Sequence, residues 1–97
     1  MSKLVIVAKF VAHAEHVEHV ARELNGLVEP TRVEAGCERY DLHRSVEDAC
    51  VFLFFEEWSS RQEWEAHLQA PHLTACRASL EGRIADRELL QLEPFEG

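Results

Sequence analysis

The chain has few of the residues that hold small disulfide-rich or zinc-stabilised domains together. Its 97 residues include three cysteines and no C-x-x-C pair. Cys37, Cys50 and Cys76 are odd in number, widely separated and embedded in apolar pattern, which is typical of reduced thiols that pack as small hydrophobic residues. The sequence therefore predicts neither a disulfide framework nor a cysteine-based metal site.

Basic residues are also scarce. Ten Lys and Arg stand against eighteen Asp and Glu, which gives a formal net charge of -8. That sign disfavours association with phosphate backbones and with anionic lipid. We therefore expect no nucleic-acid partner and no membrane partner.

Long hydrophobic runs are missing too. No apolar run approaches the roughly 20 residues that a membrane-spanning helix needs. The start, Met1-Ser2-Lys3, leads into a strand pattern rather than into a signal peptide. We expect a cytoplasmic protein, and the absence of any internal linker or low-complexity tract predicts a single domain over residues 1–97.

What the chain does have is a strand-like segment, 50–58, that is apolar on both alternating faces. Val51, Leu53 and Phe55 fall on one face, and Phe52, Phe54 and Trp58 on the other. Side chains of a strand alternate between the two faces of its sheet, so both faces must be covered here. Because the few helices of so short a chain can cover only one face, we expect a homodimer through the other.

The remaining patterns predict the order strand, helix, strand, strand, broken helix, strand. The expected strands cover 3–11, 37–45, 50–58 and 87–95, and the first helix covers 14–29. Ser60 and Glu63 fit a capping box that starts the second helical segment, and Pro71 breaks that segment and opens the next helix, in which Leu73, Cys76, Leu80 and Ile84 keep helical spacing. This βαββαβ order predicts an α+β domain: a four-stranded antiparallel sheet with helices on one face.

Six histidines invite a metal hypothesis, but the spacing does not favour one. His13, His16 and His19 recur every three residues along the first helix, and the helical wheel turns them to different sides. A solvated helix face explains them better than a shared ion, so we expect no metal.

His67 and His72 are more informative, because they flank Pro71 close to the doubly apolar strand. A histidine there can take a proton from a phenol or an enol, or can orient an oxygen. The alternative is structural: His67 bonded to a backbone carbonyl and His72 serving the first turn of its helix. Spacing alone favours this structural alternative.

The end of the same strand carries charged and aromatic candidates. Glu56 and Glu57 place at least one carboxylate beside buried surface, where burial raises the pKa unless Arg44 or Arg61 pairs with it. An ordinary ion pair is the commoner outcome. Trp58 and Trp64 could form a wall for a flat ligand, although aromatic residues at such positions more often belong to the core.

Four motifs together resemble the antibiotic biosynthesis monooxygenase (ABM) domain family, and in particular its small quinol-monooxygenase-like members. The motifs are L-V-E-P-T-R at 27–32, G-C-x-R-Y-D-L-H-R-S at 36–45, F-x-E-x-W at 54–58 and H-L-x-x-P-H-L at 67–73. The resemblance implies a ferredoxin-like fold that dimerises through its sheets into a dimeric α/β barrel, with a substrate pocket between sheet and helices. Some members oxidise hydroxylated aromatics with dioxygen and without metal or flavin.

On that resemblance we expect a monooxygenase that needs no cofactor and acts on a small quinol or hydroxylated aromatic with dioxygen. His67 and His72 are the expected catalytic residues. The expected substrate-binding residues are Tyr40, Phe54, Glu56, Trp58 and Trp64.

Other branches of the family leave alternatives open. The haem-degrading pattern would put His67 where a tryptophan belongs and Arg77 where a histidine belongs, so haem degradation is not expected. A branch that acts on a phosphorylated quorum-signal derivative has a P-H-x-x-x-C arrangement similar to that of Pro71, His72 and Cys76, which keeps isomerase-like chemistry open. A non-catalytic dimeric binding or stress module is the third possibility.

Overall fold

Four strands form one antiparallel sheet in the computed structural model of the chain, which describes residues 3–95. They are β1 (Leu4–Ala12), β2 (Cys37–Arg44), β3 (Val51–Trp58) and β4 (Ile84–Leu92). The order across the sheet is β2-β3-β1-β4, and every neighbouring pair is antiparallel. The two strands that the sequence makes apolar on both faces, β1 and β3, are thus the two central ones.

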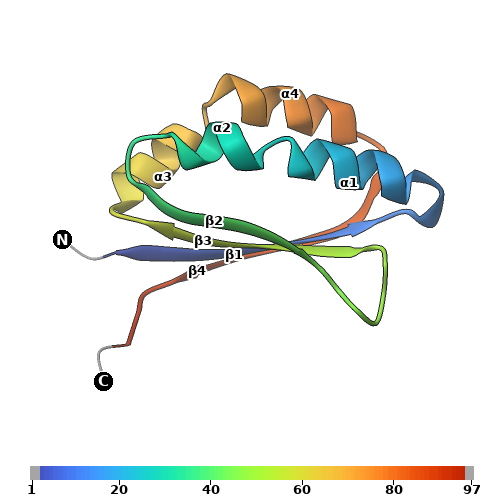
Figure 1. Cartoon of the computed structure of the whole chain (residues 1–97), viewed down its shortest axis with the longest axis horizontal. Coiled ribbons are helices and arrows are strands. Elements are labelled where there is room, and N and C mark those ends of the chain that lie inside the picture. The colour runs from blue at the N-terminus through green and yellow to red at the C-terminus, as the bar shows by residue number, and fades with distance from the viewer. Residues whose placement is uncertain (1–2, 96–97) are drawn as a thin grey trace.

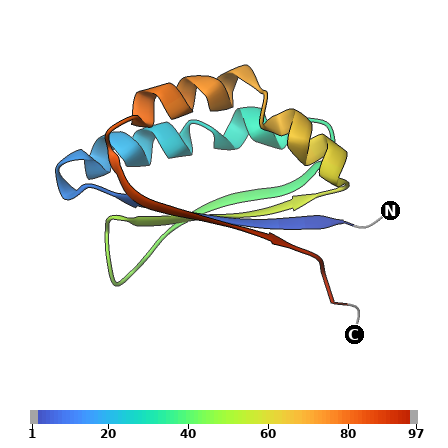
Figure 2. The same cartoon turned by 180° about the vertical axis from the view of Figure 1, so that it is seen from behind.

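All helices lie on one face of this sheet, as Figures 1 and 2 show from opposite sides. They are the 3-10 turn η1 (Ala14–His16) and the helices α1 (Val17–Asn25), α2 (Val28–Arg32), α3 (Arg61–His67) and α4 (Pro71–Leu80). The predicted α+β, ferredoxin-like architecture is therefore confirmed.

Burial follows the alternation of the central strands. On β3 every second residue, from Phe52 to Trp58, is buried against the helices, while the residues between them are only half-buried. The half-buried set belongs to the uncovered face of the sheet, together with Val7 of β1, which pairs with Phe55 on one side and with Leu90 of β4 on the other. An apolar surface of this kind supports the homodimer, which stays a prediction.

The first helical segment is broken, where the sequence pattern predicted one helix over 14–29. The chain forms η1, α1 and α2, with a turn at Gly26 and Leu27 between the two α-helices. Pro30 was expected to end the helix, but it is the third residue of α2. A proline is tolerated there because the first N–H groups of a helix have no intrahelical acceptor.

The last strand begins and ends three residues earlier than the predicted 87–95. Ile84 keeps helical spacing with Leu80, yet α4 stops at Leu80 and Ile84 starts β4. Gly82 has φ +79°, a left-handed backbone conformation that takes the chain out of the helix and that glycine adopts without strain.

Two predicted helix starts are confirmed. Ser60 caps α3, because its side chain accepts a hydrogen bond from the Glu63 N–H, and Pro71 occupies the first turn of α4. The cysteines carry no disulfide, as expected. Within residues 3–95, none of the helices combines the length and the apolar character required to cross a bilayer.

Candidate functional site

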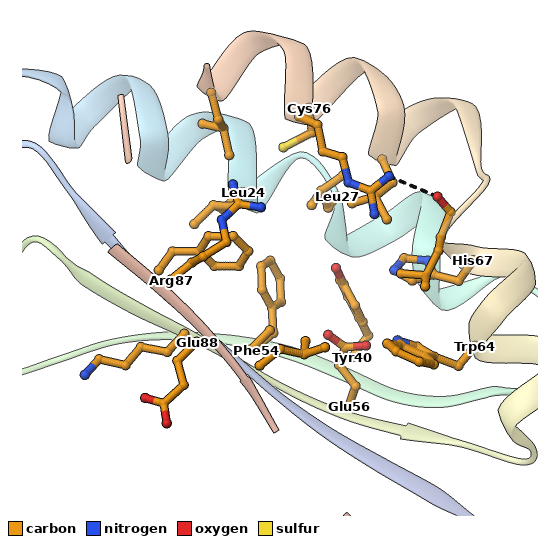
Figure 3. Close-up of a pocket in the computed structure, with 18 residues that line it drawn as sticks. Leu24, Leu27, Tyr40, Phe54, Glu56, Trp64, His67, Cys76, Arg87 and Glu88 are labelled. Atoms are coloured by element: carbon orange, nitrogen blue, oxygen red, sulfur yellow. Dashed lines mark hydrogen bonds between the residues drawn. The ribbon is translucent and has the colours of Figure 1, made fainter. Parts of the chain in front are cut away.

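A cavity of about 320 Å³ lies between the sheet and the helices. Its floor comes from β1, β2 and β3, its roof from α1 and α4, and one side from β4 (Figure 3). Five of the seven predicted site residues line it: Tyr40, Phe54, Glu56, Trp64 and His67. The structure thus brings together side chains from two neighbouring strands and from α3 around one partly open cavity.

The other two predicted site residues, Trp58 and His72, are not part of the lining. Trp58 is fully buried, with its ring stacked at 4.9 Å from that of His67. His72 lies behind His67, with 6.2 Å between the ring centres. For these two residues direct contact with a ligand is therefore not supported: His72 reaches the cavity only through its neighbours, and Trp58 contacts two lining residues, His67 and Glu56.

His67 is held by the carboxylate of Glu34. Its Nδ1 lies 2.9 Å from Glu34 Oε2, and because an ionised carboxylate only accepts hydrogen bonds, the ring donates from this nitrogen. Glu34 lies outside the lining whereas His67 belongs to it, which leaves Nε2 as the ring nitrogen available to the cavity. Figure 3 shows the imidazole at the cavity wall near Tyr40. The structural alternative from the sequence, a bond from His67 to a backbone carbonyl, is not what the structure has.

Burial lowers the pKa of His67, and Glu34 opposes the effect by favouring the imidazolium. The ring is therefore neutral at neutral pH, with its proton on Nδ1 and a free lone pair on Nε2. A neutral imidazole with an accepting nitrogen directed at a small apolar space is suited to take a proton from a bound hydroxyl group.

Glu34 was not among the predicted site residues. It follows the end of α2, in a connection without periodic pattern, and only the tertiary structure brings it to α3 and α4. Its Oε2 lies 2.7 Å from His72 Nε2, and Thr31 Oγ1 lies 3.2 Å from the same nitrogen. The one available signal was its position as an acid between the first two quoted motifs, which was too weak to select it.

Glu56 is the second ionisable group of the cavity. Its side chain is buried, and Trp58 Nε1 donates a hydrogen bond of 2.9 Å to Glu56 Oε1. Burial raises the pKa of Glu56 to about 7, and the bond from Trp58 works against that rise. Neither Arg44 nor Arg61 pairs with it: Arg44 lies over the ring of Phe52, and Arg61 bonds Gln91.

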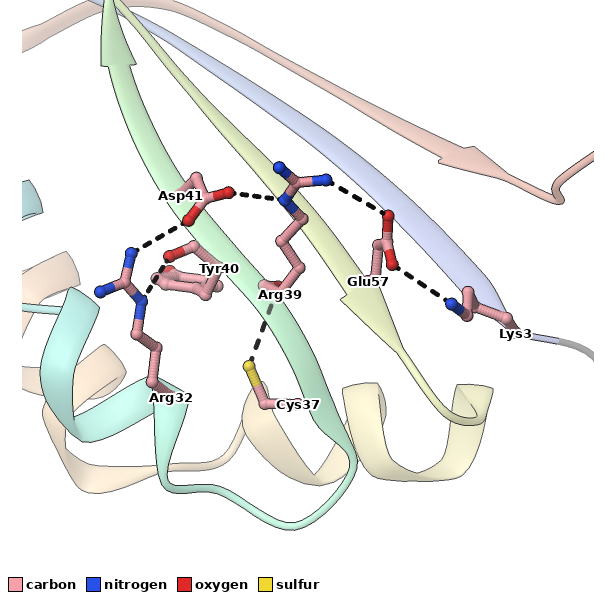
Figure 4. Close-up of polar contacts among 7 residues, drawn as sticks. All are labelled: Lys3, Arg32, Cys37, Arg39, Tyr40, Asp41 and Glu57. Carbon is pink, nitrogen blue, oxygen red and sulfur yellow. Dashed lines mark hydrogen bonds and ion pairs between the residues drawn. The ribbon is translucent and has the colours of Figure 1, made fainter.

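Glu57, one residue further on, has the opposite surroundings. It points to the uncovered face of the sheet and pairs with Lys3 at 3.2 Å and with Arg39 at 3.9 Å (Figure 4). The ion pair that the sequence favoured is therefore the outcome for Glu57, while Glu56 has the raised pKa that the sequence offered as the other outcome. Because successive side chains of β3 point to opposite faces of the sheet, Glu56 lies on the face that the helices cover and Glu57 on the uncovered face.

Glu56→Gln is expected to remove a pH-dependent loss of stability. A carboxyl with a pKa of about 7 in the folded chain and 4.5 in the unfolded chain retains its proton longer in the folded state. The free energy of unfolding therefore falls as pH rises from 4.5 to 7, by a total of about 3 kcal/mol. Urea unfolding at pH 5 and pH 8 measures this effect. The free energy of unfolding of the variant, relative to that of the parent protein, should be higher at pH 8 than at pH 5 by about 2 kcal/mol.

Glu47→Gln is the matched control, because it makes the same chemical change at an exposed position in the connection between β2 and β3. Substitutions at exposed positions change stability little, so this variant should follow the parent protein at both pH values. An identical pH trend in the parent protein and in Glu56→Gln would contradict the assignment of the buried proton to Glu56.

Tyr40 and Cys76 complete the polar part of the lining. Burial raises the pKa of the Tyr40 phenol far above its ordinary value and that of the Cys76 thiol to about 11. Both groups therefore stay protonated at neutral pH. Tyr40 can donate or accept a hydrogen bond toward a ligand, whereas a protonated thiol is a poor nucleophile.

Two arginines border the cavity near the surface. Arg77 of α4 donates to the Leu68 carbonyl at 3.1 Å, and the Arg87 guanidinium lies over the Phe10 ring at 5.5 Å. Glu88, next to Arg87 on β4, points away from the cavity in Figure 3. Positive charge is thus present at the rim, while the deeper wall is apolar apart from His67, Glu56 and Tyr40.

The histidines of the first helical segment stay apart from this site. His13 is exposed, and His19 bonds the Ser79 hydroxyl of α4 at 2.8 Å, so His19 joins two helices instead of pointing to solvent as the helical wheel suggested. Within the described residues, these histidines form no common ligand set.

Comparisons with known proteins agree with this architecture. Residues 3–79 match the family model described as "Antibiotic biosynthesis monooxygenase". "Putative monooxygenase Rv0793" of Mycobacterium tuberculosis is 30% identical over 79 residues, which cover 81% of this chain and 77% of that protein. Its solved structure superposes with a TM-score of 0.91 at 26% identity, covering 99% of this chain and 98% of that one. The crystal structure of PA3566 from Pseudomonas aeruginosa superposes with a TM-score of 0.95 at 31% identity, covering 99% and 97%. The chain is therefore a member of the antibiotic biosynthesis monooxygenase family.

Proposed function

We propose that this protein is a monooxygenase that needs no cofactor and oxidises a small quinol or other hydroxylated aromatic with dioxygen. The observation that carries the proposal is the environment of His67. Its Nδ1 lies 2.9 Å from Glu34 Oε2, and the ring lines a partly open, mainly apolar cavity that its Nε2 can serve. The cavity volume lies at the lower end of the range of about 300–1,000 Å³ that is typical of ligand pockets, which suits a small aromatic.

The chemistry begins with a proton transfer. His67 Nε2 takes a proton from a hydroxyl group of the bound quinol, and the Glu34 carboxylate stabilises the imidazolium that forms. The quinolate is a good one-electron donor, so it can reduce dioxygen and then combine with it at a ring carbon. Loss of water from that adduct gives a hydroxyquinone, and the balance is one quinol and one dioxygen to one hydroxyquinone and one water.

The surroundings of His67 serve this sequence of steps. Phe54 and Trp64 supply flat apolar surface for an aromatic ring, and Tyr40 can hydrogen-bond the second oxygen of the substrate. Glu56, with a pKa of about 7, is a second group that can exchange a proton with the substrate. The apolar inner wall of the cavity also limits contact of the radical pair with water.

Arg77 and Arg87 favour a second candidate, isomerase-like chemistry on a small phosphorylated metabolite, because a phosphate needs cationic partners. Both guanidiniums belong to exposed residues at the rim, however, and the buried acid Glu56 would repel a phosphate placed deeper. The first candidate uses the polar groups of the inner wall, so we prefer it.

Oxygen consumption with a panel of hydroquinones tests the proposal. We expect uptake that depends on the protein and is not lost when a chelator is added, together with hydroxyquinone as the product. No uptake across the panel would contradict oxidation and would leave the isomerase and the non-catalytic binding module. Uptake that disappears with chelator would contradict the absence of a cofactor.

A further inference from the structure

We infer that Glu34, His67 and His72 form a binding site for one divalent first-row transition ion of the zinc type. Nothing in the proposed oxidation requires this ion, so the inference does not depend on the proposed function. It also differs from the expectation drawn from the sequence, which considered only the histidines near the N-terminus and predicted no metal.

The first support is convergence. One carboxylate oxygen and two imidazole nitrogens, each from a different segment, all lie within 4.8 Å of one another. Two histidines and one carboxylate form a ligand set that binds zinc in hydrolases and iron in oxygenases, with the other positions open to water. Thr31 Oγ1, 3.2 Å from His72 Nε2, is a further polar group beside the cluster.

The second support is the distances. Glu34 Oε2 lies 2.7 Å from His72 Nε2 and 2.9 Å from His67 Nδ1. Around a tetrahedral zinc ion with bonds of about 2.0–2.1 Å, ligand atoms are roughly 3.3 Å apart. The two distances from Glu34 must therefore open by only about half an ångström, which the long side chain of Glu34 can allow, and the two histidine nitrogens lie within 4.8 Å of each other.

The third support is charge. The Glu34 side chain is 17% exposed, and its ion-pair partners within the described part of the chain are the two histidines, with no Lys or Arg among them. The carboxylate charge of Glu34 is thus paired with no permanently charged side chain of residues 3–95. A cation that replaces the shared protons would neutralise this charge, which is costly to bury unpaired.

Orientation and access are also suitable. His67 is fixed by the ring of Trp58 at 4.9 Å and by that of Tyr40 at 5.7 Å, whereas the His72 side chain is 25% exposed and gives the ion a path from solvent. An ion on His67 Nδ1 leaves the ring proton on Nε2. Binding would thus change the cavity-facing nitrogen from a hydrogen-bond acceptor into a donor.

Titration of the chelator-treated full chain with Zn²⁺, followed by calorimetry, and with Co²⁺, followed by its visible absorption, tests the site. We expect one ion per chain and a Kd that weakens at least about tenfold in Glu34→Gln and in His72→Ala. Both changes avoid the fully buried His67, and circular dichroism checks that each variant folds. The double variant His13→Ala, His16→Ala removes two histidines outside the cluster and should bind like the parent protein.

Two results would overturn the inference. One is the absence of binding heat and of any cobalt spectrum at millimolar metal. The other is binding that persists in both cluster variants or disappears in the double variant. Because the readout is binding alone, the two proposals are tested separately: a chelator-treated, ion-free protein that consumes no oxygen would refute the proposed oxidation and leave the metal site standing.

Discussion

Replacing His67 with asparagine is expected to lower kcat/KM for hydroquinone oxidation by about 10²- to 10⁴-fold. Asparagine can keep an N–H near the position of Nδ1 and so keep the bond to Glu34, but it has no atom equivalent to Nε2. The variant therefore loses the group that accepts the substrate proton while it preserves most of the local packing. Initial rates of oxygen uptake, with thermal unfolding as the check on folding, measure the effect.

His72→Asn is the control variant for His67→Asn. His72 bonds the same oxygen of Glu34 but lies outside the cavity lining, so its loss should disturb only the orientation of His67 and should have a much smaller effect. Full turnover in the double variant His67→Ala, His72→Ala would exclude both histidines from the chemistry. Equal losses in the two single asparagine variants would indicate that the cluster acts only as a structural unit.

A glutamate at Val7 is expected to convert a dimer into a monomer. Val7 lies on the central strand β1, between Phe55 and Leu90 on the uncovered face of the sheet. In a dimer through this face the new charge would be buried without a partner, at a cost of several kcal/mol per subunit. In a monomer it would reach water, so the subunit itself should still fold.

Light scattering measures the outcome directly. The parent protein should have twice the 11.1 kDa mass of one chain, and Val7→Glu should have the mass of one chain. Val46→Glu makes the same chemical change at a fully exposed position in the connection between β2 and β3, and it should leave the dimer intact. A parent protein that is monomeric at micromolar concentration would contradict sheet-to-sheet pairing.

The sequence predicts the architecture well where local chemistry decides the structure. The two apolar faces of β3, the cap at Ser60 and the proline at the start of α4 each act through neighbouring residues, so their patterns hold in the structure. The errors occur where local signals are ambiguous. Ile84 fits the helical spacing of α4 as well as it fits a strand, and tertiary pairing with β1 decides for the strand.

The site was predicted less completely than the fold, for a physical reason. Residues of β3 and α3 point to the cavity in agreement with a periodicity that can be read from the chain, but the resemblance to the ABM family selected Phe54, Glu56, Trp64 and His67 as site residues. Glu34 belongs to no helix or strand, so it has no periodic pattern. Its role depends on tertiary contacts with His67 of α3 and His72 of α4, which are far away in the sequence. Trp58 lies on the same face of β3 as Phe54 and Glu56, which made it a candidate for the lining. Residue spacing indicates the face of a strand, but it does not indicate which residues on that face reach the cavity.

One side of the cavity is formed by β4, an edge strand that pairs with β1 alone and whose residues beyond Ile84 are exposed. Substitutions at exposed positions usually change stability by about 0.5 kcal/mol or less. Arg87 and Leu89, which line the cavity from this strand, can therefore vary with little effect on the buried core or on the histidines opposite. The substrate preference of such a scaffold can be retuned, by evolution or by a directed library, through a few replaceable side chains on its rim.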